Sequence, residues 1–243
     1  MLFALSAVPA YILGSIPFGL VMARVFGLGD IREIGSGNIG ATNVLRTGNK
    51  LAAFLTLVLD AGKGAFAVLI ARALFGEGAA GVAALFAVIG HLFPIFLRFK
   101  GGKGVATFLG TLLALSFPAG LAACATWLVM ALIFRISSLS AIVAAFLAPV
   151  FTYFIYHPHG AAVVAILSVI VIAKHHANIR RLLKGEEPQL SESLLIFGWL
   201  VLAIILFLLV YMVNPMRAFV VLIVVFIVGA IKNWGIIKRK INR

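Results

Sequence analysis

A short basic, glycine-rich stretch is the first candidate for chemistry in this chain. Residues 100–107 read KGGKGVAT within a sequence that is 63% hydrophobic. Glycines let backbone N–H groups approach an anion without an obstructing Cβ, and lysine supplies a compact positive charge. A helix beginning near Val105 would direct the positive end of its dipole to the same point. These properties predict a phosphate-binding loop, because the alternative, a basic anchor for membrane topology, has no need of glycines.

Residues 100–104 are called the second glycine loop here, because another glycine-rich loop precedes them in the chain. They do not form a Walker A motif. Leu97 stands where the first glycine belongs, and Gly104 stands where serine or threonine should follow the lysine. We expect Lys103 to be a catalytic cation. The expected phosphate ligands around it are Lys100, Gly101, Gly102, Gly104 and Thr107.

The first glycine loop, residues 35–43, reads GSGNIGATN and is followed by Arg46. It contains the spacing G-x-G-x-x-G, but no strand precedes it in a βαβ unit, so a dinucleotide-binding fold is excluded. Its glycines free backbone N–H groups, its short polar side chains can hydrogen-bond, and an arginine can grip a phosphate in a bidentate manner. We therefore favour a ligand site over a polar surface loop. The expected binding residues are Ser36, Gly37, Asn38, Gly40, Thr42, Asn43 and Arg46.

A third set recurs every three residues, at His175, Asn178 and Arg181. On a helix that continues the apolar segment before it, these residues would line one side. A neutral histidine can act as a base or donor, asparagine as a polarising donor and arginine as a phosphate partner. A basic segment touching anionic lipid would explain the arginine but not the other two. We expect His175 and Asn178 to be catalytic and Arg181 to bind phosphate.

Polar residues inside apolar segments leave several alternatives open. Asp60 and Lys63 lie three apart on one helix face, where a structural ion pair and a catalytic role are equally compatible with the pattern. His91 is expected to be a structural hydrogen-bonder. Ser138 fits either a helix N-cap or a site residue. No metal site is expected, because acidic residues are few and dispersed.

Composition places the chain among polytopic membrane proteins. It has 243 residues, of which 11% are charged, and a mean hydropathy of +1.18. The net charge of +13 is scattered between apolar segments, which favours membrane orientation and anionic ligands over nucleic acid. Cys124 is the sole cysteine, so no disulfide forms within the chain.

Nine apolar segments are predicted to be membrane spans, and two of them are short. They are residues 2–22, 51–74, 78–96, 105–116, 119–134, 139–156, 161–173, 194–213 and 216–237. Splitting residues 104–134 at Phe117-Pro118 and placing the N-terminus outside leaves 17 of the 20 basic residues inside. The positive-inside rule therefore selects this topology, with the C-terminus inside.

Several motifs in one order resemble the bacterial acyl-phosphate:glycerol-3-phosphate acyltransferase family. They are GSIPFG at residues 14–19, the first glycine loop, DAGKG at 60–64, Gly90-His91, residues 99–107, Ser138-Leu139, and His175 to Gly185. The resemblance covers residues 1–188 and implies a seven-span membrane acyltransferase core, with some spans short or broken. It implies transfer of a fatty acyl group from acyl phosphate to the 1-position of glycerol 3-phosphate, giving lysophosphatidate and phosphate in the first step of phospholipid synthesis.

The resemblance also implies partners and a location. Acyl phosphate, glycerol 3-phosphate and membrane lipid are the expected partners, with functional coupling to the enzyme that makes acyl phosphate; nucleic acid and cofactors are not expected. We expect a monomer in the bacterial cytoplasmic (inner) membrane, with its active site on the cytoplasmic side and Ser138 among the catalytic residues. Either glycine loop can take either phosphate, and the general base is His175 or an oxygen of the substrate phosphate.

After residue 188 the chain departs from the family pattern. Residues 189–243 are expected to form a C-terminal two-span extension with a basic cytoplasmic tail. The alternative function is a transporter or channel for phosphorylated anions. Such a protein would place a site near the membrane midplane between inverted repeats. No internal repeat is visible, and the motifs gather on one side of the predicted topology.

Overall fold

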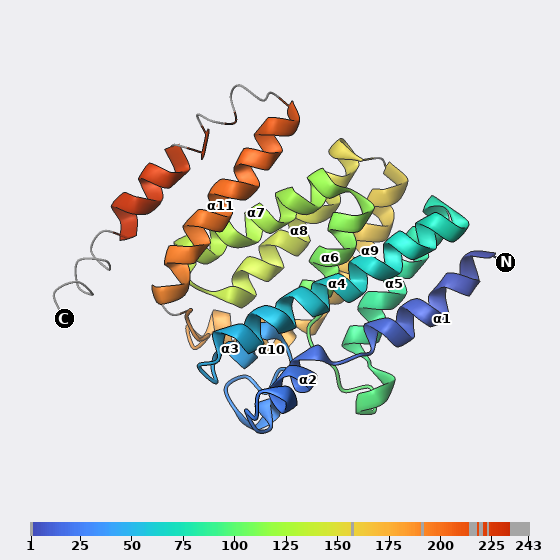
Figure 1. The fold of residues 1–243 in the computed structure, drawn as a ribbon, viewed down its shortest axis with the longest axis horizontal. Coiled ribbons are helices and arrows are strands. Elements are labelled where there is room, and N and C mark those ends of the chain that lie inside the picture. Colours follow the sequence, from blue (N-terminus) through green and yellow to red (C-terminus); the bar gives the residue numbers. More distant parts are fainter. Residues whose placement is uncertain are drawn as a thin grey trace. The chain divides into compact units, whose positions relative to one another are not determined.

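The computed structural model describes residues 2–156, 158–190, 192–213, 218, 221–222 and 224–233. Over these residues every regular element is helical and none is a strand (Figure 1). The labelled α-helices are α1 Leu2–Gly14, α2 Phe18–Val25, α3 Ala41–Leu45, α4 Lys50–Phe75, α5 Glu77–Leu92, α6 Val105–Leu115, α7 Phe117–Phe134, α8 Ser137–Ile155, α9 Pro158–Lys174, α10 His176–Leu183 and α11 Glu192–Val213. Short 3-10 turns occupy Ile31–Glu33 and Ile95–Leu97. The all-α prediction is confirmed.

Each of the nine predicted spans contains an apolar helix. Five segments are long and apolar enough to cross a membrane, namely Leu5–Val25, Lys50–Phe75, Glu77–Leu97, Phe117–Phe134 and Ser137–Ile155. A sixth is the bent pair of α9 and α10, and three apolar helices are shorter: Val105–Leu115, Val201–Val213 and Val224–Asn233. The polytopic class with short and broken spans is therefore confirmed. The predicted span 216–237 lies partly outside the described residues.

The predicted split before Pro118 is also confirmed. Ser116 takes an extended conformation (φ −147°, ψ 103°) between α6 and α7. Pro118 then stands in the first turn of α7, where its missing N–H interrupts no helical hydrogen bond.

The prediction that His175, Asn178 and Arg181 share one continuous helix is wrong. α9 and α10 bend by 59° at the break between them. The His175 N–H turns to the Ile172 carbonyl at 2.9 Å, a tight bond across three residues that ends α9. His175 therefore lies at the corner, whereas Asn178 and Arg181 share one side of α10.

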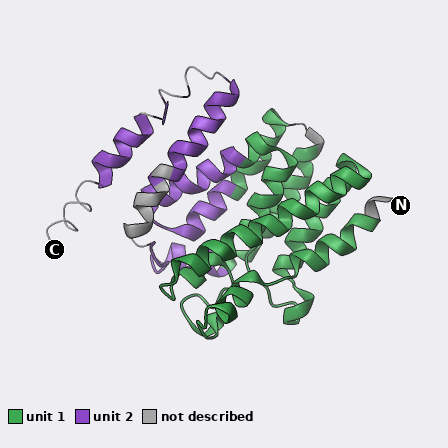
Figure 2. Ribbon diagram, in the orientation of Figure 1, with its two compact units in different colours: residues 1–120, 145–176 green, residues 121–144, 177–243 purple. Residues whose placement is uncertain are grey.

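The chain divides into two compact units, residues 1–120 with 145–176 and residues 121–144 with 177–243 (Figure 2). In the first unit, α1 packs on α5 and α4, and α4 also packs on α5 and α6 (Figure 1). Small residues let these backbones touch, since a Cβ added at Gly14 would lie 2.1 Å from the Ala87 carbonyl oxygen and one at Gly110 would lie 2.0 Å from that of Ala61.

The second unit has its own apolar cluster, in which Ala125, Leu132 and Leu202 are buried. Residues 189–243 thus fall in the same unit as residues 121–144. The functional boundary predicted after residue 188 stays a prediction.

Candidate active site

Asn43 organises the first glycine loop from within. Only 1% of the residue is exposed. Its Nδ2 donates to the carbonyls of Ile31 (2.6 Å) and Ile34 (3.3 Å), and its Oδ1 accepts from Ser36 N and Arg46 Nη1, both at 3.2 Å. The amide thus uses both of its donor hydrogens and its oxygen inside the loop. Asn43 is placed to aim Ser36 and Arg46, whose own side chains are exposed.

Gly35 allows this arrangement because it has no side chain. Its φ of +54° lies in the left-handed region, and an added Cβ would lie 2.6 Å from Asn43 Oδ1 and 2.7 Å from Arg46 Cδ. The arginine side chain therefore lies directly against the loop backbone. Asn38, Gly40 and Thr42 of the same loop are half-buried.

The second glycine loop ends where the sequence predicts, because α6 begins at Val105. Gly104 precedes it with φ 78° and supplies no capping side chain, so the first N–H groups of α6 have no side-chain cap. Lys103 is half-buried and Lys100 is exposed. Backbone donors and two ammonium groups thus occupy one short segment, as phosphate binding requires.

The two glycine loops meet at Gly102. Its N–H donates to the His91 carbonyl at 3.2 Å. A Cβ added at Gly102 would lie 2.4 Å from His91 Nε2 and 3.3 Å from Asn38 Oδ1. At Gly101 an added Cβ would lie 2.2 Å from the His91 carbonyl oxygen. Packing on His91, at the end of α5, therefore requires both glycines.

Thr107 was expected to bind phosphate, and the structure places it behind the loop. The residue is 0% exposed and lies in the contact between α6 and α4, where a Cβ added at Gly64 would lie 2.7 Å from its carbonyl oxygen. Its ligand role stays a prediction.

Glu187, a residue that sequence reasoning missed, binds Asn178 and Arg181 of the third set together with Ser138. Ser138 Oγ and Asn178 Nδ2 donate to Glu187 Oε1 at 2.7 and 2.5 Å, and Arg181 Nε donates to Oε2 at 2.7 Å. The Ser138 hydroxyl therefore binds a carboxylate and does not act as the helix N-cap considered above. The chain has only 7 acidic residues, so a carboxylate soon after Arg181 was the available signal.

The Glu187 carboxyl stays ionised in this setting. Burial raises its pKa, but the hydrogen bonds from Ser138, Asn178 and Arg181 together outweigh burial and hold the pKa below its ordinary value. A fixed negative charge thus holds three predicted site residues in place.

His175 and Asn178 are both buried, and their polar atoms are engaged differently. His175 is 1% exposed, and its Nδ1 lies 2.8 Å from the Val171 carbonyl oxygen. A carbonyl only accepts, so Nδ1 carries a proton and donates it to this hydrogen bond. Asn178 Oδ1 is buried and has no hydrogen-bond partner in the described part of the chain. Asn178 thus offers a hydrogen-bond acceptor, and the catalytic role of His175 stays a prediction.

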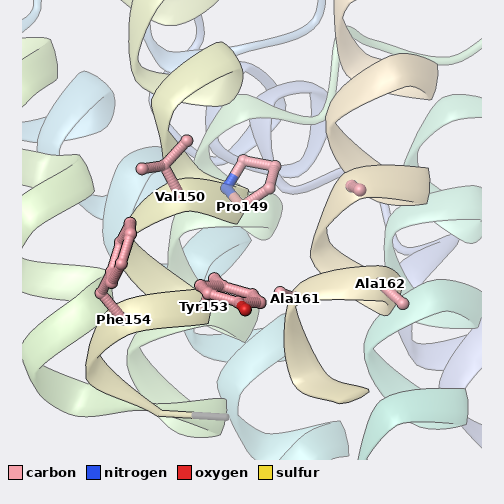
Figure 3. A pocket seen from close by; sticks show the side chains of 7 residues that line it. Pro149, Val150, Tyr153, Phe154, Ala161 and Ala162 are labelled. Atoms are coloured by element: carbon pink, nitrogen blue, oxygen red, sulfur yellow. The ribbon is translucent and has the colours of Figure 1, made fainter. Parts of the chain in front are cut away.

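The part of the chain that the structure describes contains no cluster of three or more His, Cys, Asp or Glu that suits a metal. It does contain apolar grooves. One groove, of about 460 Å³, lies between the end of α8 and the start of α9 (Figure 3). Tyr153 and Phe154 line it on α8, and Ala161 and Ala162 on α9. Its lining suits a hydrocarbon chain and not a phosphate.

A family model described as glycerol-3-phosphate acyltransferase matches residues 4–185. The chain belongs to this family. A glycerol-3-phosphate acyltransferase of Jannaschia sp. (strain CCS1) is 61% identical over 193 residues, which make up 79% of this chain and 95% of the relative. One of Cereibacter sphaeroides (strain ATCC 17025 / ATH 2.4.3) is 58% identical over 189 residues, covering 78% of this chain and 90% of the relative.

A solved structure is similar as well. It is the crystal structure of PlsY (YgiH), an integral membrane glycerol 3-phosphate acyltransferase, in its glycerol 3-phosphate form. The sequence identity is 38% and the TM-score 0.75, over 80% of this chain and 98% of that chain. The present acyltransferase is therefore a multi-pass integral membrane protein, and the family predicted from the motifs is confirmed. Membership favours acyl transfer over the transporter alternative.

Proposed function

We propose that this acyltransferase moves a fatty acyl group from acyl phosphate to the 1-position of glycerol 3-phosphate, releasing lysophosphatidate and phosphate. The observation that carries the proposal is the meeting of two glycine loops at Gly102, because two ordered anion-binding loops suit two phosphate-bearing substrates. The relative PlsY has been solved in a glycerol 3-phosphate form and in a lysophosphatidic acid form, which supports the acceptor and the product.

Each loop holds one phosphate or its neighbouring hydroxyls in this proposal. The second loop contributes Lys100, Lys103 and the N–H groups of Gly101, Gly102 and Gly104. The first contributes Ser36, Gly37, Asn38, Gly40, Thr42 and Arg46, with Asn43 ordering them. Arg181 adds its terminal guanidinium nitrogens, since only Nε is engaged by Glu187.

The reaction is an acyl transfer in which the donor is already activated. The glycerol hydroxyl oxygen attacks the acyl carbonyl carbon, an ester C–O bond forms, and the bond from that carbon to the phosphate oxygen breaks. Phosphate leaves with the electron pair, and Lys103 and Arg46 stabilise its charge. The hydroxyl proton passes to His175 or to a phosphate oxygen of the substrate, while Asn178 Oδ1 accepts a hydrogen bond from the substrate.

The charge distribution supports a bacterial inner-membrane location with the N-terminus outside and the site on the cytoplasmic side. In the simplest arrangement the protein is a monomer and receives its acyl phosphate from the enzyme that makes this substrate.

Residues 1–188 form the catalytic core in this proposal. A chain ending at Gln189 should therefore keep its turnover, with a lowered unfolding temperature because Leu202 no longer covers Ala125 and Leu132.

The deciding experiment uses purified protein in detergent with palmitoyl phosphate, glycerol 3-phosphate and a metal chelator. Phosphate and lysophosphatidate are followed together, and equimolar release is expected. Detergent removes any compartment, so transport cannot produce this signal. Turnover with acyl-CoA but not with acyl phosphate would refute the proposed donor.

A further inference from the structure

A buried ionic cluster lies beneath the second glycine loop, among residues that the reaction above does not use. The side chains of Lys63 and Asp60 are 1% and 2% exposed, and Lys63 Nζ lies 2.7 Å from Asp60 Oδ1. Lys63 Nζ also donates to the Ile16 carbonyl at 2.7 Å and lies 3.0 Å from His91 Nδ1. An ammonium group has three N–H donors, and this one meets three possible acceptors.

These contacts fix the proton on the His91 ring. The carboxylate of Asp60 favours the charged form of Lys63, and neither it nor the Ile16 carbonyl can donate. Asp60 Oδ1 lies 3.6 Å from His91 Nδ1, beyond hydrogen-bond distance, whereas Lys63 Nζ lies at 3.0 Å, so Nδ1 accepts the third N–H of the ammonium. A ring protonated on Nδ1 would instead point an N–H at the Lys63 ammonium, 3.0 Å away. The neutral ring consequently carries its hydrogen on Nε2.

The Nε2 edge faces the second glycine loop. A Cβ added at Gly102 would lie 2.4 Å from Nε2, so only the absence of a side chain there leaves the N–H uncovered on that side. His91 is 4% exposed, and Nε2 has no hydrogen-bond partner among the residues that the structure describes. Nε2 is not one of the fully buried unpaired polar atoms in the described part of the chain, so a ligand can still reach this donor.

We infer that His91 is a further phosphate-binding residue, whose Nε2–H donates to a phosphate oxygen held by the second glycine loop. Asp60 and Lys63 are positioning residues, because they set the tautomer of His91 without touching the substrate. The inference rests on the proposed function and adds a neutral donor to its cations. The phosphate is that of glycerol 3-phosphate or of the acyl phosphate, which share this chemistry.

Two substitutions separate the two edges of the ring. His91→Asn keeps an acceptor near the position of Nδ1 and removes the Nε2 donor, whereas His91→Gln keeps an amide donor near Nε2 and loses the acceptor. His176→Asn is the matched control, because that histidine is exposed on α10. KM is measured for glycerol 3-phosphate and for palmitoyl phosphate, and calorimetry gives Kd for glycerol 3-phosphate and inorganic phosphate.

The Asn variant should weaken one phosphate ligand by roughly 10- to 100-fold, the effect of a hydrogen bond to a charged group. The Gln variant should bind the same ligand within about threefold of the wild-type affinity. The substrate whose KM rises identifies which phosphate occupies the loop. The inference is overturned if the Asn variant binds like wild type, or if both variants lose the same affinity. The role of His91 would then be to bind Lys63 alone.

Calorimetry keeps this test separate from the proposed function. If the wild type binds phosphate but does not turn over acyl phosphate, the proposed function fails while the Asn and Gln comparison still decides the inference. If both variants fail to fold, ¹⁵N NMR of the wild type decides, with resonances assigned by substituting the other histidines in turn. Protonated Nδ1, or an Nε2 resonance that saturating phosphate does not move, would overturn it.

Discussion

Replacing Glu187 by glutamine tests whether a single carboxylate holds Ser138, Asn178 and Arg181 in place. Glutamine has nearly the same shape, but only one of its two terminal atoms accepts hydrogen bonds. With its oxygen toward Ser138 and Asn178, its NH₂ group faces the Arg181 Nε–H, donor against donor. The opposite orientation gives up the hydrogen bonds from Ser138 and Asn178.

The expected size of the effect follows from the hydrogen bond that Arg181 donates to Glu187. A hydrogen bond to a charged group contributes about 1.5–3 kcal/mol, and the lower end applies because the Arg181 side chain is 35% exposed. About 1.4 kcal/mol corresponds to a tenfold change. We therefore expect kcat/KM of Glu187→Gln to fall by about tenfold and the unfolding temperature to drop slightly. Glu186→Gln is the matched control, because that neighbouring carboxylate is exposed.

The pH dependence gives a second signature. The folded pKa of Glu187 lies below its ordinary value of 4.5. Its stabilising effect is therefore fully present above that ordinary value and is lost as the pH falls through the lowered folded pKa. The difference in the free energy of unfolding between wild type and Glu187→Gln should be constant from about pH 6 to 8 and should shrink in acid. Equal kcat/KM for both proteins at neutral pH would refute the positioning role.

Three further outcomes are expected. Lys103→Ala should lower kcat/KM by at least about 100-fold, with incomplete rescue by Lys103→Arg because a planar guanidinium does not replace a compact ammonium among glycines; near-normal kinetics would reduce the loop to a topology anchor. Gly102→Ala should impair turnover far more than Gly62→Ala, because an added Cβ meets a ring nitrogen at 2.4 Å in the first case and nothing within 4 Å in the second; equal effects would contradict the packing argument. In a cysteine-free background, Gly78→Cys should react with an impermeant thiol reagent from outside the cell and Lys184→Cys should not, and the reverse pattern would invert the topology.

Sequence alone determined the features that depend on a few neighbouring residues. Hydropathy predicted the apolar helices, and Pro118 predicted the boundary between α6 and α7, because a missing N–H acts locally. The density of glycine and lysine at residues 100–104 predicted an anion loop before the start of α6. Motif order carried the family, since several short patterns in one sequence constrain one another.

Tertiary structure decided the partners of the polar side chains. Ser138 and Glu187 are 49 residues apart in sequence, and Lys63 and His91 are 28 apart. Such pairs form only after helices pack, and hydrogen bonding is too short-ranged to leave a periodic trace in the chain. The bend at His175 likewise falls where the sequence has no proline or glycine, and the His175 ring at the bend is buried. The sequence therefore shows which residues can bind phosphate, whereas the packing of helices fixes which side chains orient them.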